Sequence, residues 1–187
     1  SIPKERIQVY FIDNEEYFKR KATFTDENGT LFPDNDERAI FFAKGIVETV
    51  KKLNWSPDII HIHGWMASLV PLYLKKYYAD EPLFSESKVV TSVYSKGFEE
   101  NLNPDLIKKI AFDGIPEENV AVLNNPDYNN LLKIAVDYSD AVILASEEIP
   151  EELNNHIANL QKPVLSYVPF HEFEEAYANF YNTEVLK

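Results

Sequence analysis

The stretch "SPDIIHIHGWMASLVPLYLKKYY", Ser56 to Tyr78, joins a short apolar run to a helical pattern. "DIIHI" reads as a buried strand that ends just before Gly64. The segment that follows, "MASLVPLYLKKYY", is typical of a helix. The stretch therefore predicts a strand, a loop and a helix, with two histidines and a tryptophan at the corner.

The rest of the chain repeats this alternation of strands and helices. A helix is predicted from about Asp36 to Leu53, because apolar residues recur there at spacings of three and four. Further strands are predicted at "SKVVTSVYS", "AVILAS" and "KPVLSYV", and further helices at "NNLLKIAVDYSD", "PEELNNHIANLQ" and "HEFEEAYANFYNTEVL". This order predicts an α/β fold, a Rossmann-like parallel sheet with helices on both faces.

Three segments outside this alternation have predictions of their own. "IQVYFI", Ile7 to Ile12, reads as an edge or second-layer strand. "TDENGTLFPDNDE" is rich in turn residues and predicts a surface loop or a short hairpin. The stretch from Lys96 to about Asp127 is irregular, with a short helix expected from Pro104 to Ala111. Because no repeat or flexible linker divides the chain, we expect one domain over residues 1–187.

The composition bounds the classes of function. A chain of 187 residues with 45% apolar content is sufficient for one sizeable core. The net charge of −13 disfavours nucleic acid as a partner, since its binding needs clustered Lys and Arg. The absence of cysteine excludes disulfides and thiol nucleophiles, and it favours the cytoplasm. No apolar run approaches the roughly 20 residues of a membrane helix, so no membrane association is expected.

Ligands of parallel α/β sheets gather at the carboxyl ends of the strands. That rule selects three loops, which hold His63-Gly64-Trp65, Tyr94-Ser95 and Ser146. His61 and His63 should share a face of their strand, because the side-chain period of a strand is two. A metal pair is conceivable there, but the sequence offers no third ligand cluster, and we expect no metal.

Each of these side chains also has a purely structural interpretation. His61 lies within a strand and reads best as a core histidine with satisfied hydrogen bonds. His63 lies at the loop, where a neutral imidazole can donate to a sugar hydroxyl or to a backbone carbonyl. Trp65 can stack on a sugar ring or pack at the head of the helix. The residues alone leave these alternatives open.

Motifs for phosphate binding and for nucleophilic catalysis are missing from the sequence. The five glycines are all isolated, so neither G-x-G-x-x-G nor a P-loop can be written. The G-x-S-x-G nucleophile elbow is absent too. We therefore expect no cofactor, and the residues alone lead to an α/β domain with a candidate ligand edge.

Several segments together resemble the N-terminal domain of bacterial glycogen and starch synthases, which transfer glucose from a sugar nucleotide to an α-glucan. They are "VYFIDNEEYFKR", "DNDERAIFFAKGIVETVKKLNWSPDIIHIHGW" and "NNLLKIAVDYSDAV", and they run in family order over roughly Val9 to Leu153. The resemblance implies one half of a GT-B type glycosyltransferase. It implies ADP-glucose and an α-glucan as substrates.

On this resemblance, His63 matches the family's functional histidine, which contacts the transferred glucose in the interdomain cleft. Trp65 matches the tryptophan of the same motif. The resemblance thus implies a catalytic role for His63 and substrate contacts for the residues around it, namely Gly64, Trp65, Tyr94, Ser95 and Ser146.

The chain departs from the family pattern at these same loops. Gly64 stands where the family has Asp, and Tyr94-Ser95 stand where it has His-Asn. Leu144-Ala145 replace a Thr-Val pair, and Ile149 stands where Tyr is usual. The family's Lys-x-Gly-Gly-Leu segment is expected upstream and its second, nucleotide-binding domain downstream.

Three hypotheses follow for the function. The chain is part of an ADP-glucose-dependent glucan synthase that is inactive without a second domain or partner chain. Alternatively, it is a non-catalytic glucan-binding or regulatory module. The resemblance leaves open whether the chain is an excised fragment or a stand-alone relative with the first domain alone. The third hypothesis is an unrelated α/β enzyme acting on a small molecule.

Overall fold

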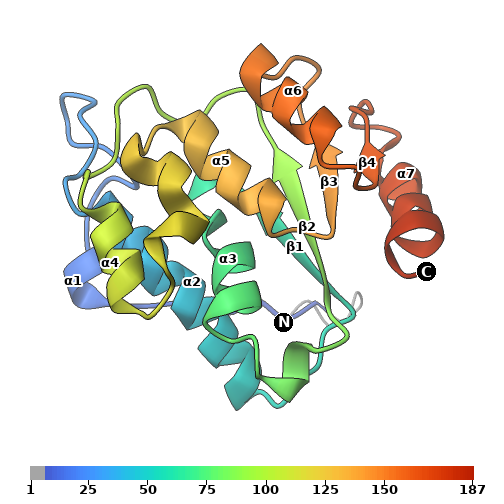
Figure 1. Cartoon of the computed structure of the whole chain (residues 1–187), viewed down its shortest axis with the longest axis horizontal. Coiled ribbons are helices and arrows are strands. Elements are labelled where there is room, and N and C mark those ends of the chain that lie inside the picture. The colour runs from blue at the N-terminus through green and yellow to red at the C-terminus, as the bar shows by residue number, and fades with distance from the viewer. Residues whose placement is uncertain (1–6) are drawn as a thin grey trace.

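The computed structural model describes residues 7–187, which form a parallel sheet surrounded by helices (Figure 1). The strands are β1 (Ile59–His63), β2 (Lys88–Val93), β3 (Ala141–Leu144) and β4 (Val164–Leu165). The α-helices are α1 (Glu15–Phe18), α2 (Asn35–Lys52), α3 (Val70–Lys76), α4 (Leu106–Phe112), α5 (Tyr128–Asp137), α6 (Glu151–Asn159) and α7 (Phe173–Phe180). Shorter turns are the 3₁₀ segments Trp65–Ala67, Pro82–Phe84 and Glu117–Asn124, and the π-helical turn Tyr181–Val185.

The sheet has the strand order β1-β2-β3-β4, and every neighbouring pair is parallel. His63 is level with Ser92, and Val93 is level with Leu144. The carboxyl ends of the first three strands therefore reach the same edge of the sheet. The predicted Rossmann-like parallel sheet is confirmed, with helices on both of its faces.

One face of the sheet carries the main hydrophobic core. Helices α3, α5 and α6 lie in one layer over this face, with α2 and α4 packed beside them (Figure 1). The core is built from fully buried aliphatic and aromatic side chains, among them Val47, Leu72, Tyr73, Leu131 and Leu153. Burial of this apolar surface is the main stabilising contribution to the fold.

The opposite face is covered by α7 and the π-helical turn that follows it (Figure 1). Phe180 and Val185 pack there against Val90, Ala141 and Ile143. The helix predicted at "HEFEEAYANFYNTEVL" is therefore present, and its aromatic face closes the domain's own sheet.

The prediction of a strand at Ile7 to Ile12 is wrong. Residues 8–14 have no regular secondary structure, and the side chains of Val9, Tyr10 and Phe11 are exposed. Ile12 instead contacts Gly45 of α2 through its side chain. A β-branched and aromatic run forms a strand only where a neighbouring strand pairs with it, and sequence propensity does not supply the neighbour.

The other segment predictions hold. Thr25 and Leu31 form an antiparallel bridge, which closes the turn-rich segment as a short hairpin. Helix α4 matches the short helix expected after Pro104, and the 3₁₀ segment Glu117–Asn124 was not predicted. Within the described part of the chain, no helix is long and apolar enough to cross a membrane.

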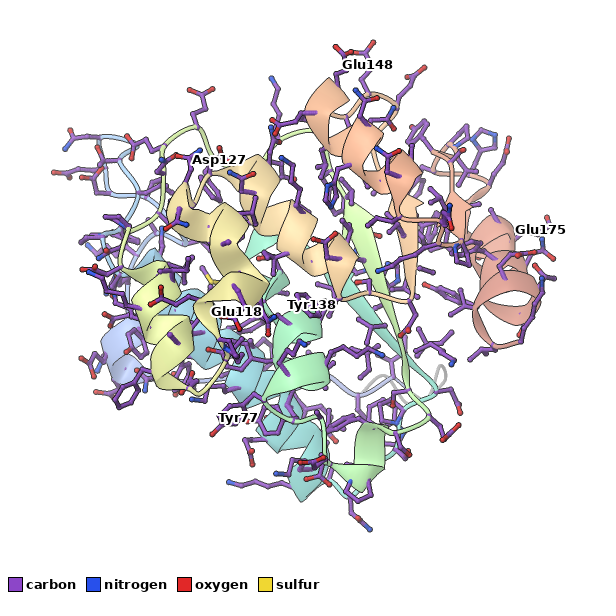
Figure 2. All side chains as sticks on the ribbon, viewed as in Figure 1. Tyr77, Glu118, Asp127, Tyr138, Glu148 and Glu175 are labelled. Atoms are coloured by element: carbon purple, nitrogen blue, oxygen red, sulfur yellow. The ribbon has the colours of Figure 1, made fainter. Side chains whose placement is uncertain are left out.

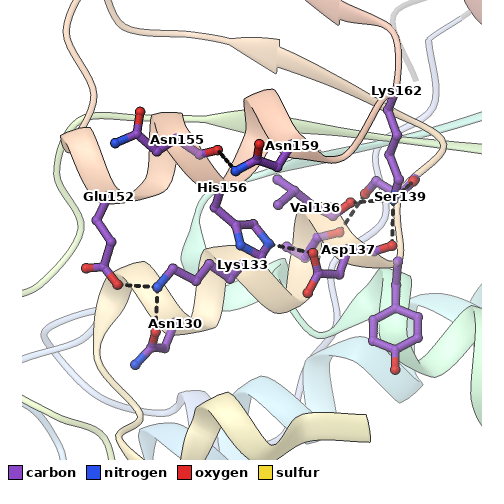
Figure 3. A network of polar contacts seen from close by, with 12 residues as sticks. Asn130, Lys133, Val136, Asp137, Ser139, Glu152, Asn155, His156, Asn159 and Lys162 are labelled. Atoms are coloured by element: carbon purple, nitrogen blue, oxygen red, sulfur yellow. Dashed lines mark hydrogen bonds and ion pairs between the residues drawn. The ribbon is translucent and has the colours of Figure 1, made fainter.

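Polar contacts hold together the amino ends of β3 and β4 (Figure 3). The ammonium group of Lys162 donates to the backbone carbonyls of Val136 and Ser139, at 2.8 and 2.7 Å, and also to that of Asp137. These carbonyls lie at and just beyond the carboxyl end of α5, where a positive charge is favourable. His156 of α6 is 2.6 Å from Asp137, and Lys133 of α5 is paired with Glu152 of α6.

Candidate functional site

The predicted site residues all lie at or just beyond the carboxyl ends of β1, β2 and β3. His63 is the last residue of β1, Tyr94 and Ser95 follow β2, and Ser146 follows β3. Two hydrogen bonds connect the three loops. His63 Nδ1 is 2.8 Å from the hydroxyl of Tyr94, and the Ser95 N–H donates to Ser146 Oγ at 3.1 Å.

His63 is exposed at this edge of the sheet. Its ring centroid lies 4.0 Å from that of His61, because both side chains point to the same face of β1 as the sequence predicted. The partial burial of the ring lowers the pKa of His63 below its ordinary value, so the imidazole is neutral near pH 7. Nδ1 is engaged by Tyr94, and no hydrogen bond within residues 7–187 engages Nε2.

His61 is the structural member of the pair. Its Nε2 is 2.7 Å from Ser92 Oγ, and its Nδ1 is 2.5 Å from the hydroxyl of Tyr181. Burial, with a smaller contribution from His63, lowers the pKa of His61 to about 4. The structural interpretation of His61 as a histidine with satisfied hydrogen bonds is confirmed.

Gly64 turns the chain sharply after β1. Its φ of 75° and ψ of 155° belong to a region that L-residues rarely adopt, whereas the space around its Cα is open. Trp65 follows with only 5% of its surface exposed. The indole packs between Phe24 and Phe98, with ring centroids 4.8 and 4.9 Å away. Trp65 therefore belongs to the core at the head of the helix, and its exposed margin lines an adjoining hollow.

Two hollows flank the segment Gly97–Glu99, which follows the β2 loop. One, of about 470 Å³, lies between this segment, the start of α5 and Pro150; it is also lined by Ser95 and Lys96. The other, of about 500 Å³, lies between this segment and the hairpin, and Phe24, Thr25 and Trp65 line it. Phe98 lines both, and its ring is nearly perpendicular to that of Tyr128 at a centroid distance of 5.7 Å.

Sequence reasoning missed two residues of this region, Phe98 and Tyr128. The hydroxyl of Tyr128 donates to the Tyr94 carbonyl at 2.8 Å and so holds the loop after β2 in place. A Cβ at Gly97 would lie 2.2 Å from the Tyr128 ring, so glycine is required there by close packing. An isolated glycine two residues after Ser95 was the available signal, but nothing in the sequence identified Tyr128 as its neighbour.

A further hollow of about 650 Å³ lies between α1, α2 and α4. Its lining includes Tyr17, Phe41 and the exposed Phe112, and it contains none of the six predicted site residues. Although this hollow is larger than the two that flank Gly97–Glu99, it shares no lining residue with them, and we do not assign it to the candidate site. Within residues 7–187, no group of three or more His, Asp or Glu side chains is close enough to hold a metal ion.

The charge around the carboxyl edge is mainly negative. Figure 2 shows Asp127 and Glu148 at the rim formed by the starts of α5 and α6. Lys96 is the cation that lines the hollow beside Ser95, where Glu99 also lies. Neutral imidazole and hydroxyl groups among carboxylates can exchange hydrogen bonds with sugar hydroxyls, whereas phosphate groups need clustered donors or cations. The described residues of this edge suit a neutral polyol better than an anion.

Comparisons with known proteins agree with the resemblance in the sequence. The family model described as the starch synthase catalytic domain matches residues 1–162. A glycogen synthase from Chlorobium limicola is 37% identical over 155 residues, covering 82% of this chain and 31% of the relative. A glycogen synthase from Thermotoga petrophila is 30% identical over 154 residues, covering 81% of this chain and 30% of the relative. The chain thus spans about a third of the length of the curated relatives that it matches.

Proposed function

Since the chain belongs to the family of starch synthase catalytic domains, we propose that it is a glucosyltransferase domain of the glycogen synthase type, forming one half of a GT-B enzyme. Its reaction would be the transfer of glucose from ADP-glucose to an α-1,4-glucan. The observation that carries the proposal is the meeting of three strand ends around His63, which stays exposed with Nε2 unengaged by the described residues.

In this proposal His63 contacts the sugar that is transferred. Its neutral ring can donate or accept one hydrogen bond at Nε2, toward a glucose hydroxyl. Ser95 and Ser146 supply hydroxyls beside it, and Tyr94 and Gly64 shape the loops. Trp65 supports the wall of the adjoining hollow, since its ring is nearly all buried.

We further propose that the chain alone does not transfer glucose at a measurable rate. Departure of the nucleotide requires donors that stabilise the leaving phosphate, and losing even one such donor can cost about 3 kcal/mol. The carboxyl edge offers Lys96 among several carboxylates. A second nucleotide-binding domain or a partner chain would supply the missing donors, as would the family's Lys-x-Gly-Gly-Leu segment, which these 187 residues do not contain.

The assay is incorporation of labelled glucose from ADP-glucose into glycogen, with the wild-type chain and the His63→Ala variant side by side. We expect background counts from both. Product that depends on His63 would contradict the predicted inactivity of the isolated chain and would support the assigned role of His63.

A second candidate is a non-catalytic glucan-binding or regulatory module of the same family. The departures at Gly64, Tyr94 and Ser95 favour it, as does an edge of neutral donors. Retardation in native gels that contain glycogen tests it. We expect retardation that the His63→Ala variant weakens and that His171→Ala, a change at an exposed histidine, leaves unchanged. Absence of retardation would count against a glucan-binding role.

The partners and the location remain part of the proposal. An α-glucan and ADP-glucose are the proposed ligands, and the net charge of −13 speaks against nucleic acid. The absence of cysteine supports the cytoplasm.

A further inference from the structure

We propose that Tyr94 is a positioning residue for His63: its hydroxyl donates to Nδ1 and holds the imidazole as the Nε2–H tautomer, so that His63 meets its ligand as a hydrogen-bond donor. The inference that His63 donates a hydrogen bond to a ligand rests on the proposed function, whereas the inference about its tautomer does not. Tyr94 is one of the positions at which the resemblance implies a departure from the family pattern.

The pairing of β1 with β2 places the two side chains together. His63 is level with Ser92, and Tyr94 lies two residues further on, which turns its side chain to the same face of the sheet. Along this face the two strands form two successive histidine–hydroxyl pairs. His61 Nε2 lies 2.7 Å from Ser92 Oγ, and His63 Nδ1 lies 2.8 Å from the Tyr94 hydroxyl.

We infer the direction of the second bond from the acceptor that is available to the phenol, because at this distance a phenol can either donate to Nδ1 or accept from it. Burial raises the pKa of Tyr94 above its ordinary value, so the phenol keeps its proton near pH 7. Within residues 7–187, His63 Nδ1 is the hydrogen-bond partner of that hydroxyl. When the phenol donates to Nδ1, that nitrogen acts as the acceptor, and the proton of the neutral ring must lie on Nε2.

The backbone that carries the phenol is held in place by two hydrogen bonds. The Tyr94 carbonyl accepts from the hydroxyl of Tyr128 at 2.8 Å, and the next N–H, that of Ser95, donates to Ser146 Oγ. The ring of His61, tilted by 42° with its centroid 4.0 Å away, limits rotation of the His63 ring. A neutral ring with its proton on Nε2 has no lone pair to offer at that nitrogen. In this state His63 can donate to a sugar oxygen but cannot act as a general base through Nε2.

The experiment is a long-range ¹H–¹⁵N correlation spectrum of the imidazole rings in the uniformly ¹⁵N-labelled full chain, near neutral pH. The His63 signals are assigned with the His63→Gln variant. We expect the pattern of a single Nε2–H tautomer in the wild type. In Tyr94→Phe, which keeps the ring and removes the hydroxyl, the tautomer ratio should move toward Nδ1–H by roughly fivefold, the equivalent of one neutral hydrogen bond.

The matched control is Tyr177→Phe, because this neighbouring tyrosine of α7 is not hydrogen-bonded to His63. It should leave the His63 pattern unchanged, and backbone amide spectra would report any loss of fold in either variant. An Nδ1–H pattern in the wild type would overturn the inference. An unchanged pattern in folded Tyr94→Phe would overturn it equally.

Adding a maltooligosaccharide to the same sample separates this inference from the proposed function. If the sugar binds at the edge, the Nε2–H signal of His63 should shift. A correct tautomer with no shift at saturating sugar would count against the proposed function and would still support the positioning role of Tyr94.

Discussion

The two edges of the sheet are built on different principles. At the amino edge, polar groups are paired with one another: Lys162 reaches three carbonyls, and Asp140 accepts from the Val89 N–H at 2.7 Å and from Lys75. At the carboxyl edge, His63 is exposed and its Nε2 is not engaged by the described residues. Removing one partner of a paired polar group lowers stability, whereas an unpaired polar group can bind a ligand. The amino edge should therefore govern stability, and the carboxyl edge should govern binding.

The largest effect on stability is expected at the amino edge. Lys162→Met removes three charge-assisted hydrogen bonds and leaves carbonyls beyond α5 without these donors. We expect the free energy of unfolding to fall by about 2 to 3 kcal/mol. Urea titration followed by circular dichroism measures it.

The control for this change is Lys108→Met, which removes an exposed ion pair with Asp105 and should leave the free energy of unfolding nearly unchanged. Equal stability of the two variants would show that the amino edge is not held as described. Neither variant should alter retardation by glycogen.

A smaller effect, dependent on pH, is expected at His61, between the two edges. The pKa of His61 is about 4 in the folded chain and near 6.5 in the unfolded chain, so protonation favours unfolding. The resulting loss of stability begins as the pH falls below about 6.5 and levels off below about 4. It should reach about 2 kcal/mol, since part of the ring is accessible to solvent.

The measurement compares the pH dependence of unfolding for the wild type and for His61→Gln, whose stability should fall less steeply through this window. His171→Gln is the control, because that side chain is exposed and outside the sheet. Identical slopes for the wild type and His61→Gln would contradict the low pKa of His61.

The smallest effect on stability is expected for Ser146→Ala at the carboxyl edge. This change should also weaken glucan binding. The change leaves the Ser95 N–H without its acceptor and loosens the contact between the β2 and β3 loops. We expect a loss below about 1 kcal/mol in unfolding together with weaker retardation in glycogen gels. Ser166→Ala, an exposed position after β4, serves as the control. A stable variant with unchanged retardation would remove Ser146 from the proposed site.

The strand and helix order was predictable from sequence because each element carries a local pattern. Helix α2 and strand β2 follow from periodicity and from β-branched content, and the rule for parallel sheets then places His63, Tyr94 and Ser146 at one edge. The strand expected at Ile7 to Ile12 failed, because pairing depends on a distant neighbour. Hydrogen bonds such as that from Tyr128 to Tyr94 were invisible for the same reason. They join residues more than 30 positions apart through the tertiary fold.

Gly64 limits the residues that its turn can accept. Its backbone adopts a conformation that glycine tolerates and that strains any other residue, although no atom beyond the adjacent residues lies within 4 Å of the place a Cβ would take. An aspartate at this position would therefore strain the backbone dihedral angles, although its Cβ would meet no atom beyond the adjacent residues. A side chain at this position is therefore accommodated only if the whole turn adopts another conformation, so the Gly64 backbone restricts the substitutions that this loop can accumulate.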